Sequence, residues 1–137
     1  MGKRRILYRQ WKNGLREGEG TIYYPNGTIK SKCNWINGKR EGYGKYIYEN
    51  GEYYEGQFKN GLRHGKGKYY YSNGNIKYDG DFSEDKFEGN GKGYWEDGEC
   101  YVGQWKNDVR NGKGIQYYIN GKIKYKGEFF NDKFVEN

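Results

Sequence analysis

The 137-residue sequence contains one proline, Pro25, one histidine, His64, and two cysteines, Cys33 and Cys100. A single proline excludes a proline-rich or polyproline architecture. One histidine and two distant cysteines provide neither a zinc cluster nor a Cys-His nucleophile, so we expect no enzymatic activity, no metal and no cofactor. We expect His64 to be solvated and both cysteines to be reduced. The first ten residues lack the long apolar segment of a secretory signal, which favours a cytoplasmic protein.

Glycine and aromatic residues are abundant instead. The sequence has 24 glycines and 17 tyrosines, 20% of its residues are aromatic, 31% are charged, and the net charge is +7. A hydrophobic fraction of only 33% would fit a disordered chain, but disordered segments are poor in aromatic residues. We therefore expect a folded chain in which glycine is used inside regular structure.

A bulky ring recurs along the chain at intervals of alternately 24 and 23 residues. The six rings are Trp11, Trp35, Phe58, Phe82, Trp105 and Phe129. A Gly-x-Gly motif begins seven residues after each of the first five rings and is missing after the sixth. A fixed period of roughly 20 to 50 residues is the signature of a repeat array rather than of an ordinary globular domain. The sequence therefore predicts five full units and a partial one.

Turn signals occur twice in each unit and divide the chain into short segments without a helical period. Asn-Gly is the strongest short-range signal for a hairpin, because both residues of the turn adopt positive φ. The predicted turns are Asn13-Gly14, Asn26-Gly27, Asn37-Gly38, Asn50-Gly51, Asn60-Gly61, Asn73-Gly74, Asp97-Gly98 and Asn120-Gly121, with Asp85-Lys86, Asn107-Asp108 and Asn131-Asp132 as degenerate members.

These turns predict an all-β fold: an elongated, single-layer antiparallel β-meander of successive hairpins, solenoid-like, with about eleven strands. The units span approximately residues 7–30, 31–53, 54–77, 78–100 and 101–124, with a partial unit at 125–137, in a single domain of residues 1–137.

The first turn of each unit determines which residues face each other across its hairpin. Around Asn60-Gly61, a simple two-residue turn predicts the pairs Phe58 with Arg63, Gly56 with Gly65 and Tyr54 with Gly67. One face then carries rings and glycines, and the other carries polar side chains. A ring beside a glycine shields the bare backbone and offsets the weakness that glycine gives a strand. We therefore predict a structural furrow of rings and glycines along one face. It consists of Trp11, Gly18, Gly20, Trp35, Gly42, Gly44, Tyr54, Gly56, Phe58, Gly65, Gly67, Tyr78, Gly80, Phe82, Gly89, Gly91, Tyr101, Gly103, Trp105, Gly112 and Gly114.

Two further details follow from this register. Arginine faces the bulky ring in four units, where a guanidinium stacks on an aromatic ring for roughly 0.5 to 2 kcal/mol, and Phe87 replaces it in the fourth unit. The arginines are Arg16, Arg40, Arg63 and Arg110. The alternation of the period must not shift the strands by one residue, because that would send the rings to the other face. We predict that the shorter units contain a three-residue loop with a bulge, for example at residues 50–52, which pairs Tyr48 with Tyr54.

The pattern Y-x-G-x-[WF]-x-N-G-x-x-x-G-x-G with a second N-G closely resembles the MORN repeat (membrane occupation and recognition nexus) over nearly the whole chain. The best matches are Tyr54, Gly56, Phe58, Gly61, Gly65, Gly67 and Gly74, and Tyr101, Gly103, Trp105, Gly112, Gly114 and Gly121. The first unit departs from the pattern at Leu7 and Arg9 and the second at Ser31 and Cys33, which fits terminal capping units. The resemblance implies a sheet of hairpins that serves as a binding or assembly platform. It also implies a place in cytoskeletal or membrane-proximal scaffolds, and phospholipid binding.

Three kinds of partner are compatible with the sequence. A protein-binding scaffold would use the furrow or an unpaired sheet edge. A peripheral membrane protein would bind anionic phospholipids, such as phosphoinositides or phosphatidic acid, through basic residues. The candidates for these contacts are Lys3, Arg4, Arg5, Lys66 and Lys68. A nucleic-acid binder would combine stacking rings with basic residues. We favour the scaffold and do not expect nucleic acid, because the rings are needed to cover glycine and the lysines alternate with carboxylates. Asp79 and Asp81, for instance, are expected to oppose Lys68 and Lys66.

The carboxy-terminal segment, residues 122–137, keeps the ring of a unit but lacks the Gly-x-Gly motif. It brings Phe129, Phe130 and Phe134 to the edge of the predicted sheet, and an unpaired edge accepts a further strand. We predict that this segment mediates self-association or receives a partner strand. The alternative is a monomer in which charged side chains keep this edge in solvent.

Overall fold

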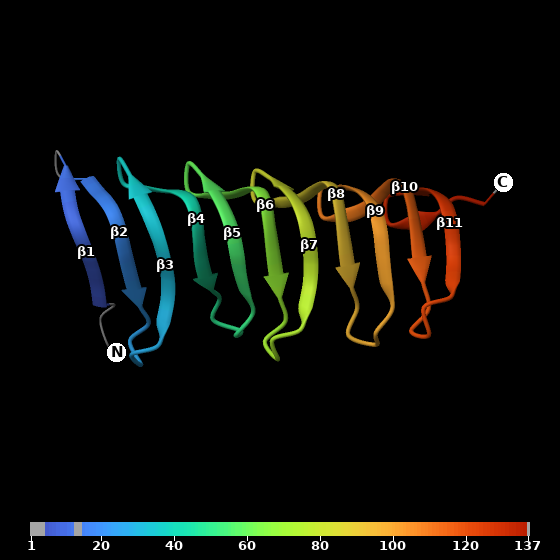
Figure 1. Cartoon of the computed structure of the whole chain (residues 1–137), viewed down its shortest axis with the longest axis horizontal. Helices are drawn as coiled ribbons and strands as arrows, with labels where there is room; N and C mark the ends of the chain where they lie inside the picture. The colour runs from blue at the N-terminus through green and yellow to red at the C-terminus, as the bar shows by residue number, and fades with distance from the viewer. Residues whose placement is uncertain (1–4, 13–14, 137) are drawn as a thin grey trace.

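The structure is a computed structural model that describes residues 5–12 and 15–136, with side chains for residue 15 and residues 17–136. Twelve strands form one antiparallel sheet in which every strand lies beside its neighbours in the sequence. Figure 1 shows the hairpins side by side in a single layer, with the two ends of the chain at opposite ends of the row. The all-β, single-layer meander predicted from the turns is confirmed. The twelfth strand has only two residues.

The strands are β1 (Arg5–Lys12), β2 (Leu15–Tyr23), β3 (Ile29–Ile36), β4 (Lys39–Ile47), β5 (Tyr53–Lys59), β6 (Leu62–Tyr70), β7 (Ile76–Ser83), β8 (Lys86–Tyr94), β9 (Cys100–Lys106), β10 (Val109–Tyr117), β11 (Ile123–Phe130) and β12 (Lys133–Phe134).

Two-residue turns with positive φ at both positions close the hairpins from β3 onward. Asn60 and Gly61 have φ values of 52° and 83°, and the other turns of this kind are Asn37-Gly38, Asn107-Asp108 and Asn131-Asp132. In the fourth unit the turn residues are Glu84 and Asp85, with φ values of 47° and 72°. The predicted turn at Asp85-Lys86 is therefore wrong by one residue. Lys86 instead pairs with Ser83, because Asp tolerates the second, left-handed position of the turn as glycine does.

Three-residue loops connect the units. In the loop after Tyr48, the Gly51 N–H donates to the Tyr48 carbonyl (2.9 Å), and the Tyr48 N–H donates to the Glu52 carbonyl (2.8 Å). The Asn50 side-chain oxygen accepts from the Glu52 N–H at 2.9 Å, which fixes the turn. The same backbone bonds close the loops after Tyr24, Tyr71, Trp95 and Tyr118.

The prediction that only the shorter units use such a loop is wrong, because units of both lengths have it. The extra residue of the longer units lies in a bulge within a strand. At Lys77 the register shifts between Tyr69 and Tyr70, and equivalent shifts place bulges at Lys30 and Lys124. Tyr54 pairs with Tyr46 rather than with Tyr48. A bulge adds one residue without sending the rings to the other face, so both unit lengths fit one sheet.

A second irregularity lies inside each hairpin. Between the pairs Phe58 with Arg63 and Gly56 with Gly67, β5 has one residue and β6 has three. The predicted pairs Gly56 with Gly65 and Tyr54 with Gly67 are therefore wrong, and Tyr54 pairs with Tyr69. The two extra residues preserve the assignment of side chains to faces. Gly65 occupies the middle of the three with a φ of 82°, a conformation that favours glycine.

The two glycines of each Gly-x-Gly motif consequently have different roles. The first glycine turns the backbone and pairs with the bulky ring of the next unit, as Gly65 does with Phe82. The second glycine lies in a row of glycines that face one another across seven strand pairs. The row is Gly44, Gly56, Gly67, Gly80, Gly91, Gly103, Gly114 and Gly127.

A tyrosine ring lies over this row in each complete central unit. A Cβ atom on Gly67 would overlap the Tyr54 ring, approaching its Cζ atom to 2.7 Å. The Tyr54 hydroxyl donates to the Gln57 carbonyl at 2.6 Å, which satisfies a carbonyl at the irregular site of the hairpin. Tyr78 and Tyr101 make the same hydrogen bond to the residue three positions later. All three tyrosines are fully buried, and burial raises the pKa of each hydroxyl above its ordinary value.

Edge-to-face contacts between rings connect successive units. Tyr54 meets Phe82 with ring centroids 4.9 Å apart, and the same contact joins Tyr78 to Trp105 at 5.2 Å and Tyr101 to Phe129 at 4.9 Å. Each such pair contributes about 0.5 to 1.5 kcal/mol beyond the burial of its area. The core is thus a continuous line of rings on one face, with no second sheet among the described residues.

Replacing Gly67 with alanine tests the contact between ring and glycine. The new Cβ would meet the Tyr54 ring, which is itself held by its hydroxyl, so we expect a loss of about 2 kcal/mol in the free energy of unfolding. Urea denaturation measures the effect. Lys68→Ala, at the adjacent exposed position on the other face, is the control and should cost less than about 0.5 kcal/mol. Equal stability of the two variants would show that the ring does not depend on bare backbone.

Candidate functional site

The predicted furrow is wrong at the first glycine of three motifs, because a Cβ on Gly65 would meet the Gln57 side chain on the opposite face, and Gly89 and Gly112 are oriented in the same way. The structure places the rings and the second glycines of the furrow on one face, hereafter the ring face. Trp35, Tyr54, Phe58, Tyr78, Phe82, Tyr101 and Trp105 are all buried there. These side chains contact one another and the glycine row, so they form the core of the protein rather than an open binding groove. Trp11 lies in β1 opposite Arg16, and its side chain is outside the described part of the chain.

The predicted partner contacts have different surroundings. Lys3 and Arg4 lie outside the described residues, and only the backbone of Arg5 is described. Lys66 and Lys68 are exposed on the opposite face, hereafter the polar face. They oppose Asp81 and Asp79 as predicted, and Lys66 forms an ion pair with Asp81. Hydrogen bonds from Lys66 and from the Asn90 N–H lower the pKa of Asp81, against the opposing effect of its partial desolvation.

Of the three carboxy-terminal phenylalanines, only one is largely exposed. Phe129 is buried against Tyr101, and Phe134 stacks on Tyr125 with ring centroids 4.8 Å apart. Phe130 is 69% exposed.

An arginine of one unit holds the hairpin turn of the next. The Arg63 Nε atom donates to the Asp85 carboxylate at 2.6 Å, and its Nη2 atom donates to the Asp85 carbonyl at 2.5 Å. The Asp85 N–H in turn donates to the Arg63 carbonyl at 2.9 Å. The guanidinium also lies 5.5 Å from the centroid of Phe82. Arg110 and Asp132 repeat these bonds, and Arg110 lies 5.4 Å from Phe129. We call each of these groups a clasp.

The other two described units use variants of this contact. Arg40 lies over the ring of its own hairpin, Trp35, at 4.8 Å, as the sequence predicted, and its carbonyl accepts from the Gly61 N–H at 3.0 Å. Phe87 stacks on Tyr78 with centroids 4.0 Å apart, and the Asp108 carboxylate accepts from the Phe87 N–H at 2.9 Å. Among the four units whose arginine or phenylalanine side chain at this position is described, a clasp therefore occurs in every second one.

This alternation defines a double unit of 47 residues, which joins one long and one short unit. It also places charges on the ring face. Lys77, at the bulge of a long unit, lies 3.7 Å from the Glu52 carboxylate, and Lys124 lies 3.2 Å from Glu99 in the next double unit. The Glu52 carboxylate also accepts a hydrogen bond from the Tyr69 hydroxyl at 2.9 Å. The lysine at the bulge, its carboxylate partner and the clasp thus recur together once in each of these two double units.

The polar face carries a continuous cross-strand row of exposed and half-buried side chains, hereafter the polar-face row. It runs through Thr21, Lys32, Lys45, Glu55, Lys68, Asp79, Lys92, Val102, Ile115 and Lys126. Charges alternate from Lys45 to Lys92, and Lys45 lies 3.4 Å from the Glu55 carboxylate. Opposite charges facing each other across strands stabilise a sheet by about 0.2 to 1 kcal/mol per pair. The alternation ends at both sides, with Lys32 facing Lys45 and Val102 facing Ile115.

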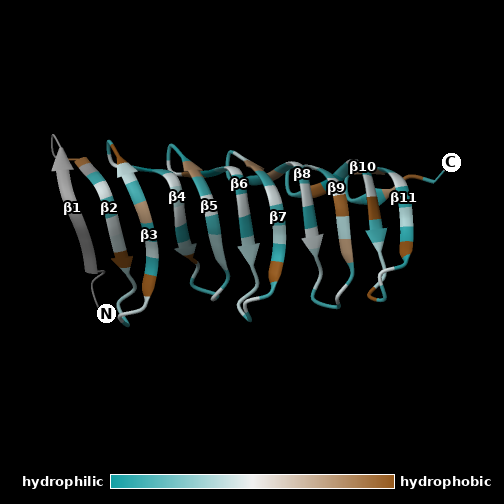
Figure 2. Ribbon diagram, viewed as in Figure 1, coloured by the Kyte–Doolittle hydropathy of each residue, from teal (hydrophilic) through white to brown (hydrophobic). Residues whose placement is uncertain are grey.

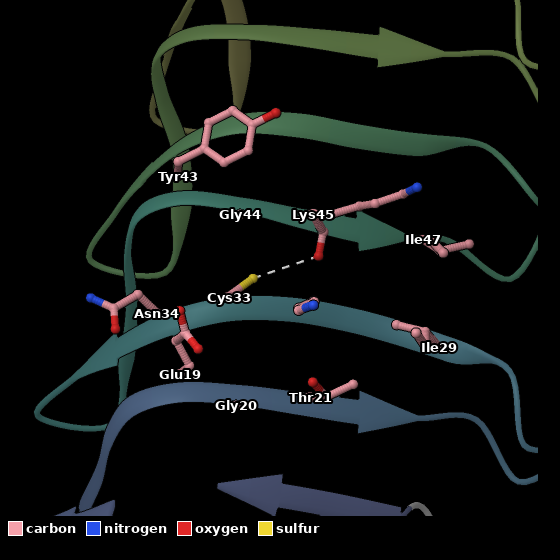
Figure 3. A pocket seen from close by; sticks show the side chains of 11 residues that line it. Glu19, Gly20, Thr21, Ile29, Cys33, Asn34, Tyr43, Gly44, Lys45 and Ile47 are labelled. Atoms are coloured by element: carbon pink, nitrogen blue, oxygen red, sulfur yellow. Dashed lines mark hydrogen bonds between the residues drawn. The ribbon is translucent and has the colours of Figure 1, made fainter. Parts of the chain in front are cut away.

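A hollow of about 740 Å³ lies on the polar face over β2, β3 and β4. Figure 3 shows its lining, with Tyr43 and Lys45 on one strand, Asn34 on the next and Glu19 on the third. Cys33 lies near its floor and donates a weak hydrogen bond to the Lys45 carbonyl at 3.6 Å. The hollow combines lysines, a carboxylate and an exposed tyrosine, so it can contact a polar ligand or a protein surface.

The residues singled out for chemistry are dispersed. Cys33 is buried in the second unit, Cys100 is half-buried in β9, and both are free thiols. His64 is half-buried in β6. The described residues include no group of three or more His, Cys, Asp or Glu that could hold a metal ion. In the same part of the chain we find no helix with the length and apolar character needed to cross a bilayer.

The clasp was not predicted, although the sequence carries a signal for it. Asp replaces the turn glycine at Asp85 and Asp132, in each case 22 residues after an arginine. By their position in the repeat, both turns are also degenerate versions of Asn-Gly. A carboxylate at a position where glycine is preferred indicates a partner in the preceding unit.

A family model described as the MORN repeat matches five segments of the chain, residues 10–29, 34–53, 54–76, 78–100 and 101–123. The matched segments agree with the hairpins of the structure and together cover most of the sequence. No curated protein matches the chain.

Replacing Asp85 with glycine tests the clasp, because glycine adopts the same turn but provides no carboxylate. Arg63, with a side chain only 15% exposed, would lose its partner. Asp108→Gly is the matched control, since its carboxylate accepts from a backbone N–H and not from a guanidinium. We expect Asp85→Gly to be less stable than the control by about 1 kcal/mol in urea denaturation, the Asp85 carboxylate being half exposed. A control of equal or lower stability would contradict a specific role of the clasp.

Proposed function

Because this chain belongs to the MORN repeat family, we propose that it is a non-enzymatic binding and scaffold module that acts through protein–protein contacts. MORN repeats occur in protein-binding and membrane-associated proteins, and the module is generally non-enzymatic. We further propose that it acts in the cytoplasm, within a cytoskeletal or membrane-proximal assembly, as the family resemblance implies.

The observation that carries this proposal is the difference between the two faces of a single layer. The ring face is filled by contacts between units, whereas no described residue forms a layer over the polar face. Apolar side chains remain exposed there and at its turns: Tyr43 is 64% exposed, Ile36 48% and Leu62 42%. A partner can therefore bind this face without any rearrangement of the described chain.

Capture from the native cell tests the proposal. We expect the immobilised chain to retain a reproducible set of proteins, part of which is lost when Tyr43→Ala and Leu62→Ala alter the polar face over β4 and β6. Both residues are exposed, so the variant should melt within a few degrees of the wild type. A matched control carries Lys59→Ala and Lys86→Ala at exposed turn positions. Equal recovery by all three proteins would show that the captured set does not depend on this face.

A second candidate function is binding of anionic phospholipids, such as phosphoinositides or phosphatidic acid. The observation in its favour is the pair Lys32 and Lys45, which face each other across β3 and β4 at the hollow. A basic residue near an anionic membrane contributes about 1 kcal/mol of attraction. Sedimentation with anionic vesicles, at low and high salt, separates this function from the first. Binding that Lys32→Gln abolishes would favour lipid over protein.

We also propose that the carboxy-terminal edge accepts a strand. β12 pairs with Phe129 and Phe130 of β11, and the Val135 N–H donates to the Glu128 carbonyl at 2.9 Å, so the part of β11 before Glu128 has no strand on this side among the described residues. Tyr125 is 37% exposed, whereas its equivalents Tyr54, Tyr78 and Tyr101 are completely buried by a further strand. Edge strands extend a sheet by backbone hydrogen bonds, and exposed rings set the register of the added strand.

Light scattering tests the self-associating form of this edge. We expect the mass of a dimer for the wild type at high concentration, and the mass of a monomer for Phe130→Glu, because a charge in place of a 69% exposed ring opposes pairing. Phe129 is unsuitable for this test because it belongs to the core. A monomeric wild type at the highest attainable concentration would eliminate self-association, and the edge would then serve a different partner.

A further inference from the structure

Residues of the polar-face row that are 47 residues apart occupy equivalent positions in successive double units. Advancing by 47 residues takes Lys45 to Lys92, Glu55 to Val102, Lys68 to Ile115, and Asp79 to Lys126. Both sets of four occupy the same places in the register of neighbouring strands. The same backbone therefore presents two different surfaces.

The earlier copy is neutral and the later copy is not. In the earlier copy a positive and a negative side chain alternate across four strands, and Lys45 and Glu55 form an ion pair. In the later copy two apolar side chains, Val102 and Ile115, face each other with a lysine beyond each of them. Lys126 has no carboxylate partner among the described residues. Where the earlier copy has two positive and two negative side chains, the later copy therefore has an apolar pair between two positive charges.

Apolar side chains continue into the adjacent row of the same face. Tyr94 faces Cys100, which faces Tyr117, one step along the strands from Val102 and Ile115. Figure 2 shows the hydrophobic bands of β9 and β10 next to each other. Val102 is 41% exposed. We call these five residues, Tyr94, Cys100, Val102, Ile115 and Tyr117, the β9–β10 patch.

Lys92, on the β8 side of the patch, lies over a ring that belongs to the patch. The Lys92 Nζ atom lies 5.2 Å from the centroid of Tyr94, so the ammonium group stays at the border of the patch. A hydrogen bond with Tyr94 also raises the pKa of Lys92 above its ordinary value. A ligand on the patch would therefore meet positive charge on both sides.

We propose that the β9–β10 patch binds a segment of a protein partner in which apolar side chains are flanked by carboxylates. This proposal rests on the proposed scaffold function and names the chemistry of one partner. Apolar side chains of the segment cover Val102 and Ile115, and its carboxylates meet Lys92 and Lys126. Charge complementarity of this kind fixes the register and accelerates association.

Two other occupants fit the patch less well. A second copy of the chain would bring its own lysines against Lys92 and Lys126, and like charges facing each other are unfavourable. A membrane would contact the long lysine side chains first, and the shorter Val102 and Ile115 between them would not reach the hydrocarbon region. A protein segment has side chains that enter the space between the lysines.

An exchange of the two copies tests the proposal. Val102→Glu with Ile115→Lys installs on the patch the pair that the same backbone carries at Glu55 and Lys68, so the variant should fold. Glu55→Val with Lys68→Ile installs the apolar pair in the earlier copy. Val102→Thr with Ile115→Thr is a third variant that keeps β-branched side chains and adds no charge. Circular dichroism melting establishes that each full-length variant is folded.

The probes are two labelled synthetic peptides of twelve residues in which valine alternates with threonine, one with two glutamates at each end and the other with two lysines. Fluorescence anisotropy measures binding. We expect the glutamate peptide to bind the wild type at least tenfold more tightly than the lysine peptide does. Affinity should fall at least tenfold in Val102→Glu/Ile115→Lys and in the threonine variant.

The remaining outcomes each decide the question. Failure of the wild type to bind the glutamate peptide, or equal binding by the wild type and the exchanged variant, would overturn the proposal. Binding of phosphatidylserine vesicles but of neither peptide would assign the patch to a membrane. If the exchanged variant captures the same cellular proteins as the wild type, the patch is wrong as a docking site but the scaffold function stands. Tighter peptide binding by Glu55→Val/Lys68→Ile than by the wild type would support the patch chemistry independently.

Discussion

The fold depends on tyrosine rings that lie directly on bare backbone. A β-sheet of one layer has no second sheet to cover its apolar face, so each ring must find its contacts within the same layer. Because the glycines of the row have no side chains, the rings of Tyr54, Tyr78 and Tyr101 can lie directly on the backbone and become fully buried. The same hydroxyls bind carbonyls at the irregular sites of the hairpins, so the ring and the distortion of the backbone stabilise each other. Glycine, which weakens most strands, is here the residue that makes a core possible.

This arrangement makes every unit incomplete without its neighbours. In the third to fifth units a tyrosine contacts the bulky ring of the following unit, and in the third and fifth units an arginine holds the following turn. The pairing of long and short units gives a period of 47 residues, in which bulge, ion pair and clasp keep fixed relations. Because the ring face is committed to these contacts, the side chains of the polar face can vary without disturbing the core. The difference between the two copies of the polar-face row is an example.

The spacing of rings and glycines was enough to predict the fold, the five repeats and the placement of the rings on one face, because the period of two in a strand leaves few alternatives. It did not predict that the first glycine of a motif turns toward the other face, as Gly65 does. The register inside the hairpin was not predictable in the same way. The Asn60-Gly61 turn alone indicates a regular ladder, and only the packing of Tyr54 over Gly67 requires two extra residues in β6. The bulges were also predicted in the wrong units. A three-residue loop followed by a bulge at Lys77 contains as many residues as a longer loop without a bulge, so chain length alone does not distinguish the two. The turn at Glu84 was misplaced because a glutamate with positive φ has no local signal.

The direction of the strands relative to the long axis has a mechanical consequence. In an antiparallel sheet the backbone hydrogen bonds are perpendicular to the strands, and in this chain they therefore point along the row of hairpins. A tension applied to the two ends of the chain pulls these bonds open one strand pair at a time rather than shearing many at once. The molecule would lengthen in steps under a small load, with each clasp adding resistance at every second hairpin. Such a chain yields gradually under tension rather than acting as a stiff tether.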